Sequence, residues 1–151
     1  MGIEHPFLAL VASMLFASMF ISIVFTFVWI TYQLQRIPVV EGFTSLSMEE
    51  SSAVVRICLR LVRGGPIALE RVLVETDHGI VELTMTAPHK AVGNATLSLR
   101  LEKFSGILIR GQEAYLIVDV ENPQEVYRRK AEYGVLVVFD SYVFSTVFSY
   151  S

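Results

Sequence analysis

The sequence predicts a mainly β protein in which a single N-terminal transmembrane α-helix precedes one soluble β domain. Three observations support this fold class: an uncharged stretch over residues 6–35, a change to alternating hydrophobic and polar residues after residue 54, and turn residues between the alternating runs. The chain has 151 residues, of which 53% are hydrophobic, and its mean hydropathy is +0.53. Outside the uncharged stretch, the segment 37–151 is long enough to bury one core unaided.

Charge and cysteine content exclude several classes of protein. The chain carries 12 basic and 15 acidic side chains, for a net charge of −3, and a single cysteine. This composition is too hydrophobic for a disordered chain and has too few cysteines for a disulfide-stapled domain. Because acidic groups outnumber basic ones, we expect no nucleic-acid partner.

The first predicted element is a transmembrane helix within residues 1–36. A helix over 6–32 would be about 40 Å long, which exceeds the roughly 30 Å hydrocarbon core of a bilayer. Trp29 and Tyr32 suit a membrane interface. A cleaved secretory signal is the alternative, but no Lys or Arg precedes the apolar run and no Ala-x-Ala site follows it. We therefore predict a permanent anchor in the membrane.

Small residues recur at a spacing of four along the predicted anchor. They form two stripes, Ala9, Ser13, Ala17 and Ser18, Ser22, Thr26. Such stripes let helix backbones approach closely in lipid, as a filament or a multi-subunit ring would require. Ala and Ser are also common in membrane helices that have no helical partner, so both interpretations stay open.

Two features give opposite indications of the side on which the soluble domain lies. Arg36 follows the apolar run, and the positive-inside rule then favours a cytoplasmic domain. The triplet Asn94-Ala95-Thr96 is a glycosylation sequon, which can be modified at Asn94 only outside the cell. With the family resemblance described below, we expect an extracytoplasmic domain.

Residues 37–52 are predicted as a linker, because Pro38 and Gly42 are followed by a polar, acidic stretch. The soluble domain is assigned to residues 53–151. Its first predicted strand, 55–61, alternates apolar residues on one face with Arg56, Cys58 and Arg60 on the other. The turn Gly64-Gly65-Pro66 ends this strand.

Further strands are predicted wherever the alternation resumes between turn residues. Asp77-His78-Gly79 is typical of a hairpin turn, 87–94 is predicted as a loop, and 124–132 as a loop or one helical turn. The predicted strands cover 68–75, 80–86, 97–102, 104–109, 114–120, 133–139 and 142–150. Seven or eight strands without a soluble helix indicate an immunoglobulin-like β-sandwich.

Apolar residues on the inward face of the predicted strands should form the core. The residues expected to be buried are Ile57, Leu59, Val72, Val74, Leu99, Ile117, Val135 and Val137.

The last predicted strand, 142–150, is the candidate association strand. It places Tyr142, Phe144, Phe148 and Tyr150 on one face and Val143, Ser145, Val147 and Ser149 on the other. The aromatic rings are core if they point inward; if they point outward, they form an exposed patch that invites a partner. In either case an edge strand here could pair with the same strand of a second copy. We therefore predict self-association or docking of a homologous partner through 142–150.

Candidate catalytic and metal-binding residues are few and scattered. His5 precedes the anchor, His78 lies in a predicted turn, His89 lies in a loop, and the lone Cys58 has no cysteine partner. Gly64-Gly65-Pro66 lacks the lysine and the helix that complete a phosphate-binding loop. We therefore expect no enzymatic activity, metal, cofactor or small-molecule substrate.

The segment 54–74 resembles the opening strands of archaeal pilin-type domains, and the later segments 109–118 and 133–139 resemble their final strands. In its organisation the chain is similar to the archaellum stator proteins, the archaeal flagellar accessory proteins F and G. That family has one N-terminal transmembrane helix and a β-sandwich facing the space beneath the S-layer. The resemblance implies a static part of the archaeal motility machinery, which holds the motor to the cell envelope. It also implies two protein partners, a homologous stator subunit and S-layer protein.

A subunit of an archaeal type IV pilus or archaellum filament is the alternative function. True pilins and archaellins carry a short basic leader that ends in Gly or Ala, whereas Gly2 here follows only Met1. This departure favours an accessory protein over a filament subunit. A third interpretation, an anchored solute-binding or sensory domain, would need a pocket with convergent polar groups.

Overall fold

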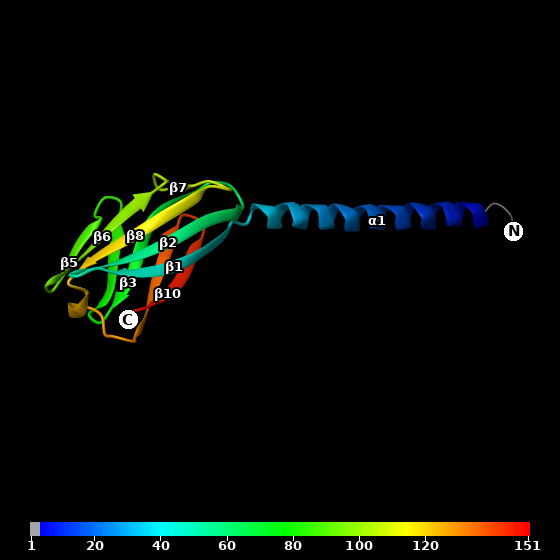
Figure 1. Ribbon diagram of the computed structural model, residues 1–151. Helices are drawn as coiled ribbons and strands as arrows, with labels where there is room; N and C mark the ends of the chain where they lie inside the picture. Colours follow the sequence, from blue (N-terminus) through cyan, green and yellow to red (C-terminus); the bar gives the residue numbers. More distant parts are fainter. Residues whose placement is uncertain (1–3) are drawn as a thin grey trace. The chain divides into compact units, whose positions relative to one another are not determined.

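The computed structural model describes residues 4–151 (Figure 1). The chain divides into two compact units, a helical one that ends at Ile37 and a β one over Pro38–Ser151. This confirms the predicted fold class, a long apolar helix followed by a β-sandwich.

The helical unit is α1, Glu4–Arg36, with 33 residues. Within His5–Arg36, an 18-residue window has a mean hydropathy of 2.4, and the segment is long and apolar enough to cross a membrane once. At its C-terminal end the Arg36 guanidinium donates a hydrogen bond to the Tyr32 hydroxyl at 2.6 Å and lies 4.6 Å from the centre of that ring. Tyr32 thus gives the one charged side chain of the last turn a polar and aromatic neighbour within the helix.

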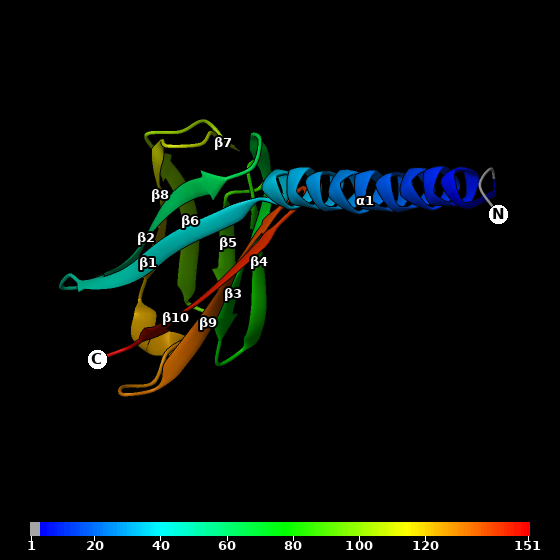
Figure 2. The same ribbon diagram turned by 90° about the vertical axis from the view of Figure 1, so that its right-hand side faces the viewer.

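The β unit consists of two antiparallel sheets that pack face to face (Figure 2). The first sheet has the strand order β1-β2-β8-β6-β5, and the second has β10-β9-β3-β4, with the short β7 paired to β3. The first sheet comprises β1 Val39–Met48, β2 Ser52–Arg63, β5 His89–Val92, β6 Ala95–Glu102 and β8 Glu113–Glu121. The second comprises β3 Ile67–Thr76, β4 Gly79–Thr84, β7 Ile107–Leu108, β9 Glu132–Phe139 and β10 Val143–Ser149.

The core lies between the two sheets and follows the predicted alternation. All eight residues expected to be buried are buried, with exposed fractions from 0% to 8%. Seven of these residues belong to the main hydrophobic cluster between the sheets, whereas Ile117 lies outside that cluster. It stands between Arg56 and Arg100 in the register of the first sheet, on the sheet's outer face. The long side chains of neighbouring arginines can shield an apolar residue in this way.

The structure corrects the assignment of residues 37–52 as a linker. Most of this segment is β1, which pairs with β2 along its whole length. The predicted loop over 87–94 likewise contains β5, whereas the strand expected over 104–109 shortens to β7. Within residues 4–151 the domain therefore has ten strands, with β1 and β5 added at the two edges of the first sheet. The segment 124–132, predicted as a loop or one helical turn, begins within the 3-10 helix Pro123–Glu125 and is otherwise turn and loop as far as β9.

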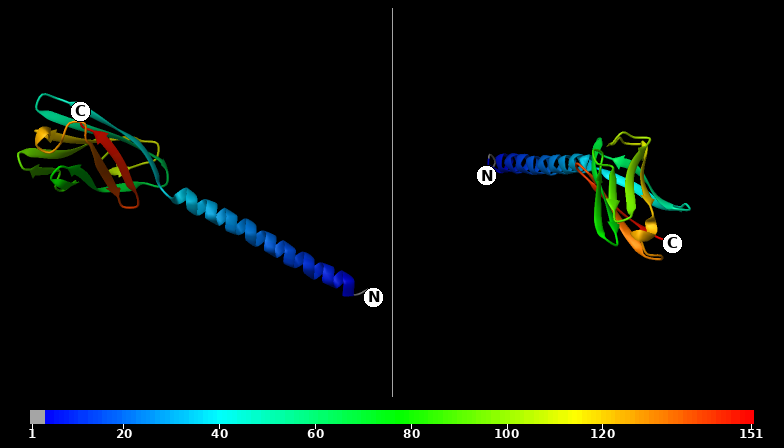
Figure 3. Two further views of the ribbon diagram at one scale, coloured as in Figure 1. Left: turned by 90° about the horizontal axis from the view of Figure 1, so that it is seen from below. Right: turned by 90° about the vertical axis from the view of Figure 1, so that its left-hand side faces the viewer.

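The edge strands of the two sheets, β1 and β10, lie side by side (Figures 1 and 3). The hydroxyl groups of Thr44 and Thr146 share a hydrogen bond of 2.5 Å across this seam. Beside it, Gly42 leaves room for the ring of Phe144, since a Cβ atom at Gly42 would lie 2.9 Å from that ring. The seam therefore joins the first and last strands of the domain through side chains.

Candidate functional site

The most distinctive surface of the domain is the outer face of the second sheet. Its residues alternate with the buried core residues of the four long strands. They are Arg71, Leu73 and Glu75 of β3; Ile80, Glu82 and Thr84 of β4; Gly134, Leu136 and Val138 of β9; and Val143, Ser145 and Val147 of β10. Ile80 is 69% exposed, Val147 57%, Val143 55% and Leu136 37%. Contiguous exposed apolar side chains of this kind are typical of an interaction surface.

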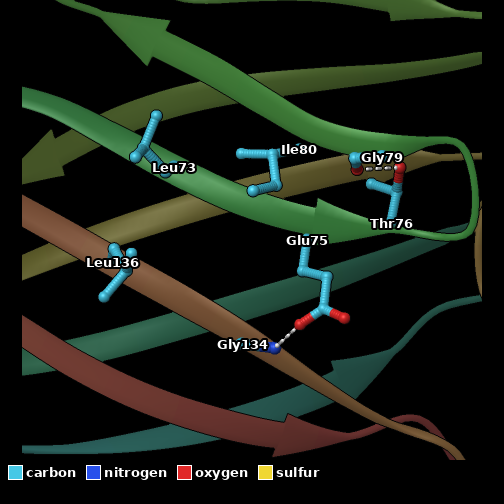
Figure 4. A pocket seen from close by; sticks show the side chains of 7 residues that line it. All are labelled: Leu73, Glu75, Thr76, Gly79, Ile80, Gly134 and Leu136. Carbon is cyan, nitrogen blue, oxygen red and sulfur yellow. Dashed lines mark hydrogen bonds between the residues drawn. The ribbon is translucent and has the colours of Figure 1, made fainter.

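A shallow hollow of about 300 Å³ lies on this face (Figure 4). It forms where two neighbouring strands separate: the pairing of β3 with β9 ends at Val74 opposite Val135, whereas β3 stays paired with β4 as far as Thr76. Gly134 has no side chain to fill the gap. The lining residues are Leu73, Glu75, Thr76, Gly79, Ile80, Gly134 and Leu136.

The polar groups of the hollow satisfy one another. The backbone N–H of Gly134 donates a hydrogen bond of 3.0 Å to Glu75 Oε2, in place of a strand partner. The Thr76 hydroxyl donates a hydrogen bond of 2.8 Å to the carbonyl of Gly79 (Figure 4). What the hollow offers outward is therefore mainly the apolar surface of Leu73, Ile80 and Leu136, which suits a protein side chain better than a polar small molecule.

The outer face of the first sheet has a different character. Arg56 forms an ion pair with Glu102 at 3.3 Å, and Arg100 forms one with Asp119 at 3.6 Å. The Arg56 guanidinium also lies 5.2 Å from the centre of the Tyr115 ring. These are exposed pairs, each of which contributes at most about 1 kcal/mol to folding. Apart from the exposed ring of Phe43 on β1, this face is a solvated lattice of opposite charges. The larger group of exposed apolar side chains therefore lies on the second sheet.

The structure decides between the two orientations predicted for the last strand. Phe148 and Tyr150 are buried, and Tyr142 and Phe144 are half-buried against the core. The rings of Tyr127, Tyr133, Phe148 and Tyr150 form one internal cluster. The interpretation of these aromatics as an exposed patch is therefore wrong. Association through the edge of β10, where the sheet ends, stays a prediction.

The remaining predicted residues lie apart from this face. Asn94 is exposed at the turn between β5 and β6, and its carbonyl accepts a hydrogen bond of 3.0 Å from the Asn122 side chain. A ring nitrogen of His78 lies 3.0 Å from the Glu125 carbonyl. A ring nitrogen of His89 lies 3.1 Å from the Ser98 hydroxyl. Asn94 is thus accessible to a modifying enzyme, while each of these histidines has a local polar neighbour.

The structure brings no metal ligands together in residues 4–151: no group of three or more His, Cys, Asp or Glu side chains could hold a metal ion there. Cys58 is a free, buried cysteine on β2. On α1, the small-residue stripes are exposed, and Thr26 donates its hydroxyl hydrogen to the Ser22 carbonyl at 2.8 Å. Their role in helix packing stays a prediction.

The outer apolar face was missed at the sequence level, although one signal for it exists. On its outer face β3 carries Leu73 between Arg71 and Glu75, and its inner face carries buried valines. Both faces of the strand therefore include apolar side chains. That signal alone does not show that Leu73 of β3 is paired with Leu136 of the neighbouring strand β9. No protein-family model matches the chain, and no curated protein is significantly similar to it.

Proposed function

We propose that this chain is a membrane-anchored structural component of the archaeal motility machinery, an archaellum stator protein. Its β-sandwich would lie outside the cytoplasmic membrane and hold the motor to the cell envelope through protein contacts. The observation that carries the proposal is the combination of one membrane-spanning helix with a sandwich that presents an apolar outer face on one sheet. The resemblance to the accessory proteins F and G supplies the machinery in which such a component works.

The requirements of a stator agree with these features. A part that resists torque must be fixed in the membrane and must not deform under load. α1 provides the anchor, and the close-packed core between two sheets provides stiffness. The partners expected are the membrane, a homologous stator subunit or a second copy, and S-layer protein.

Intact-mass measurement of the protein extracted from membranes tests the proposal against a filament subunit. A stator should retain its N-terminal residues, so the mass should correspond to the full 16.9 kDa chain, and the protein should be absent from purified filaments. Removal of an N-terminal leader, together with recovery of the protein in filaments, would contradict the proposal and favour the pilin-like alternative.

Protease accessibility tests the side of the membrane. Protease added to intact cells stripped of their S-layer should release the β unit, Pro38–Ser151. A cytoplasmic marker protein in the same cells should stay intact, which controls for lysis. Complete protection of the β unit until the cells are opened would place the domain in the cytoplasm and contradict the proposal.

A further inference from the structure

We propose that the outer face of the second sheet binds the same face of a second copy of this chain, in a symmetric face-to-face dimer with antiparallel β3 strands. The inference goes beyond the proposed function and does not depend on it. It rests on the positions of the charged residues, the apolar residues and the glycine on this face.

The register of the four strands arranges the outer residues in three rows that cross the sheet. The first row is Val143, Val138, Arg71 and Thr84. The middle row is Ser145, Leu136, Leu73 and Glu82. The third row is Val147 and Gly134, then Glu75 and Ile80, joined by the hydrogen bond between Gly134 and Glu75. Each row runs from β10 through β9 and β3 to β4.

A two-fold axis along the middle row makes this pattern complementary to itself. The half-turn reverses the strands, so the first row of one copy faces the third row of the other, strand by strand. Arg71 then faces Glu75 of the other copy, and the symmetry produces this pair twice. Leu136 and Leu73 lie nearest the centre and face their own counterparts. This is the isologous contact that a two-fold dimer requires.

Charge distinguishes this arrangement from the other two-fold packing of the same faces. An axis parallel to the strands would place Arg71 against Val138 and Glu75 against Gly134, so neither charge would meet its opposite. Both side chains are exposed in the single chain, and neither takes part in a salt bridge among the residues that the structure describes. The antiparallel arrangement is therefore favoured, because a charge covered without a partner loses its hydration without compensation.

Shape supports the same arrangement. The half-turn sets Val138 of one copy over Gly134 of the other. Glycine has no side chain, and the hollow at this point can receive the valine. It also sets Val143 over Val147, two exposed apolar side chains. The one unfavourable contact is Glu82 against its own counterpart. That pair lies on β4, at the edge of the sheet, where solvent and salt screen the repulsion.

The size of the face predicts a weak dimer. Four strands about 4.8 Å apart and three rows about 6.8 Å apart outline roughly 400 Å² per copy. The two copies together would bury about 800 Å², which is below the roughly 1,200 Å² of stable protein interfaces and within the range of weak, transient contacts. Anchoring both copies in one membrane raises their effective concentration, which compensates for a weak contact. We therefore expect the dimer in membranes and little of it in dilute detergent.

Cross-linking of the full chain in membranes tests the geometry. Facing sheets lie about 10 Å apart, beyond the reach of a direct disulfide, so a short bismaleimide reagent is the probe. In a Cys58→Ala background, Leu136→Cys should cross-link to itself at least about tenfold more than Ser45→Cys, a matched exposed position on the first sheet. A mixture of Arg71→Cys and Glu75→Cys chains should cross-link at least several-fold more than either variant alone.

Three results would overturn the inference. Leu136→Cys could cross-link no more than Ser45→Cys, which would mean that the face is free. Arg71→Cys alone could cross-link as well as the mixture, or Leu136→Cys could react with Leu73→Cys far better than with itself; either would mean another packing. Circular dichroism of each variant verifies the β fold. The position of the cross-link tests only the dimer. A failed dimer therefore leaves the proposed motility function intact, and failure of the proposed motility function would leave the dimer intact.

Discussion

The carboxylate of Glu75 accepts a hydrogen bond of 3.0 Å from the backbone N–H of Gly134, at the point where β3 and β9 stop pairing. The Glu75 side chain here replaces the backbone carbonyl that a neighbouring strand would supply. The strands can therefore separate without leaving the Gly134 N–H unpaired. Gly134 suits this position, because a Cβ atom there would lie only 3.2 Å from Glu75 Oε2. The same contact holds open the hollow on the outer face.

Removing that acceptor should have a small, specific cost. Glu75→Ala should lower the free energy of unfolding by about 0.5–1.5 kcal/mol, because the Gly134 N–H loses its protein partner. Glu75→Gln keeps an oxygen acceptor and should retain most of the stability. Thermal unfolding of the full chain in detergent, followed by circular dichroism, measures the difference. Equal losses in the two variants would show that the hydrogen bond contributes nothing.

A core truncation should cost considerably more. Leu59 on β2 is 0% exposed, so Leu59→Ala should destabilise the domain by about 2–5 kcal/mol through lost apolar burial and a new cavity. Val62→Ala, on the same strand at a 44% exposed position, should stay within about 0.5 kcal/mol of the wild type. A loss below about 0.5 kcal/mol for Leu59→Ala would mean that the inward face of β2 is assigned wrongly.

The seam between β1 and β10 should not tolerate a methyl group at Gly42. A Cβ atom there would lie 2.6 Å from the Cys58 carbonyl oxygen and 2.9 Å from the Phe144 ring. Gly42→Ala should therefore cost about 1–3 kcal/mol through overpacking. Gly65→Ala, with no atom within 4 Å of the added carbon, is the matched control. Equal unfolding temperatures for the two variants would show that β1 moves away from β10 freely.

The Tyr127 side chain should make stability depend on alkaline pH. Burial raises the pKa of its hydroxyl well above the usual value, and the hydroxyl makes no hydrogen bond to any residue that the structure describes. Above about pH 10 the unfolded chain loses this proton while the folded chain keeps it, so stability falls as the pH rises. The decline should approach about 1.4 kcal/mol per pH unit.

Tyr127→Phe should remove that part of the alkaline decline and should be neutral or slightly stabilising at pH 7, since it deletes a buried hydroxyl without a partner. Unfolding of the two proteins at pH 7 to 11 makes the comparison. Tyr133→Phe serves as the contrast, because the Tyr133 hydroxyl donates a hydrogen bond of 3.0 Å to Asp77 and should cost stability when removed. Identical pH profiles for wild type and Tyr127→Phe would contradict the predicted linkage.

The interior strands and the core could be predicted from the sequence because their residues alternate strictly. β2 and β9 present apolar side chains to one side at every second position, which no helix would do. The same rule missed β1. As an edge strand, β1 buries only Val40 fully, and its other side chains are mostly polar or exposed. Its strand conformation follows from pairing with β2, which the local sequence does not encode.

The candidate interaction surface was out of reach for a related reason. Leu73, Leu136 and Ile80 lie on three different strands, 7 to 63 positions apart in the sequence, and they become neighbours only through register. The inward orientation of Phe148 and Tyr150 was also undecided, because both faces of β10 are partly apolar. Burial against Tyr127 and Tyr133 settles it.

Swimming motility tests the central proposal most directly. Under the proposed function, cells of the source organism that lack this chain should assemble envelope and membrane normally but lose directed swimming. Complementation with the full chain should restore swimming, whereas a variant whose residues 1–36 are replaced by a cleavable secretion signal should not, because an unanchored domain cannot resist torque. Wild-type swimming speed in cells that lack the chain would contradict a role in the motility machinery.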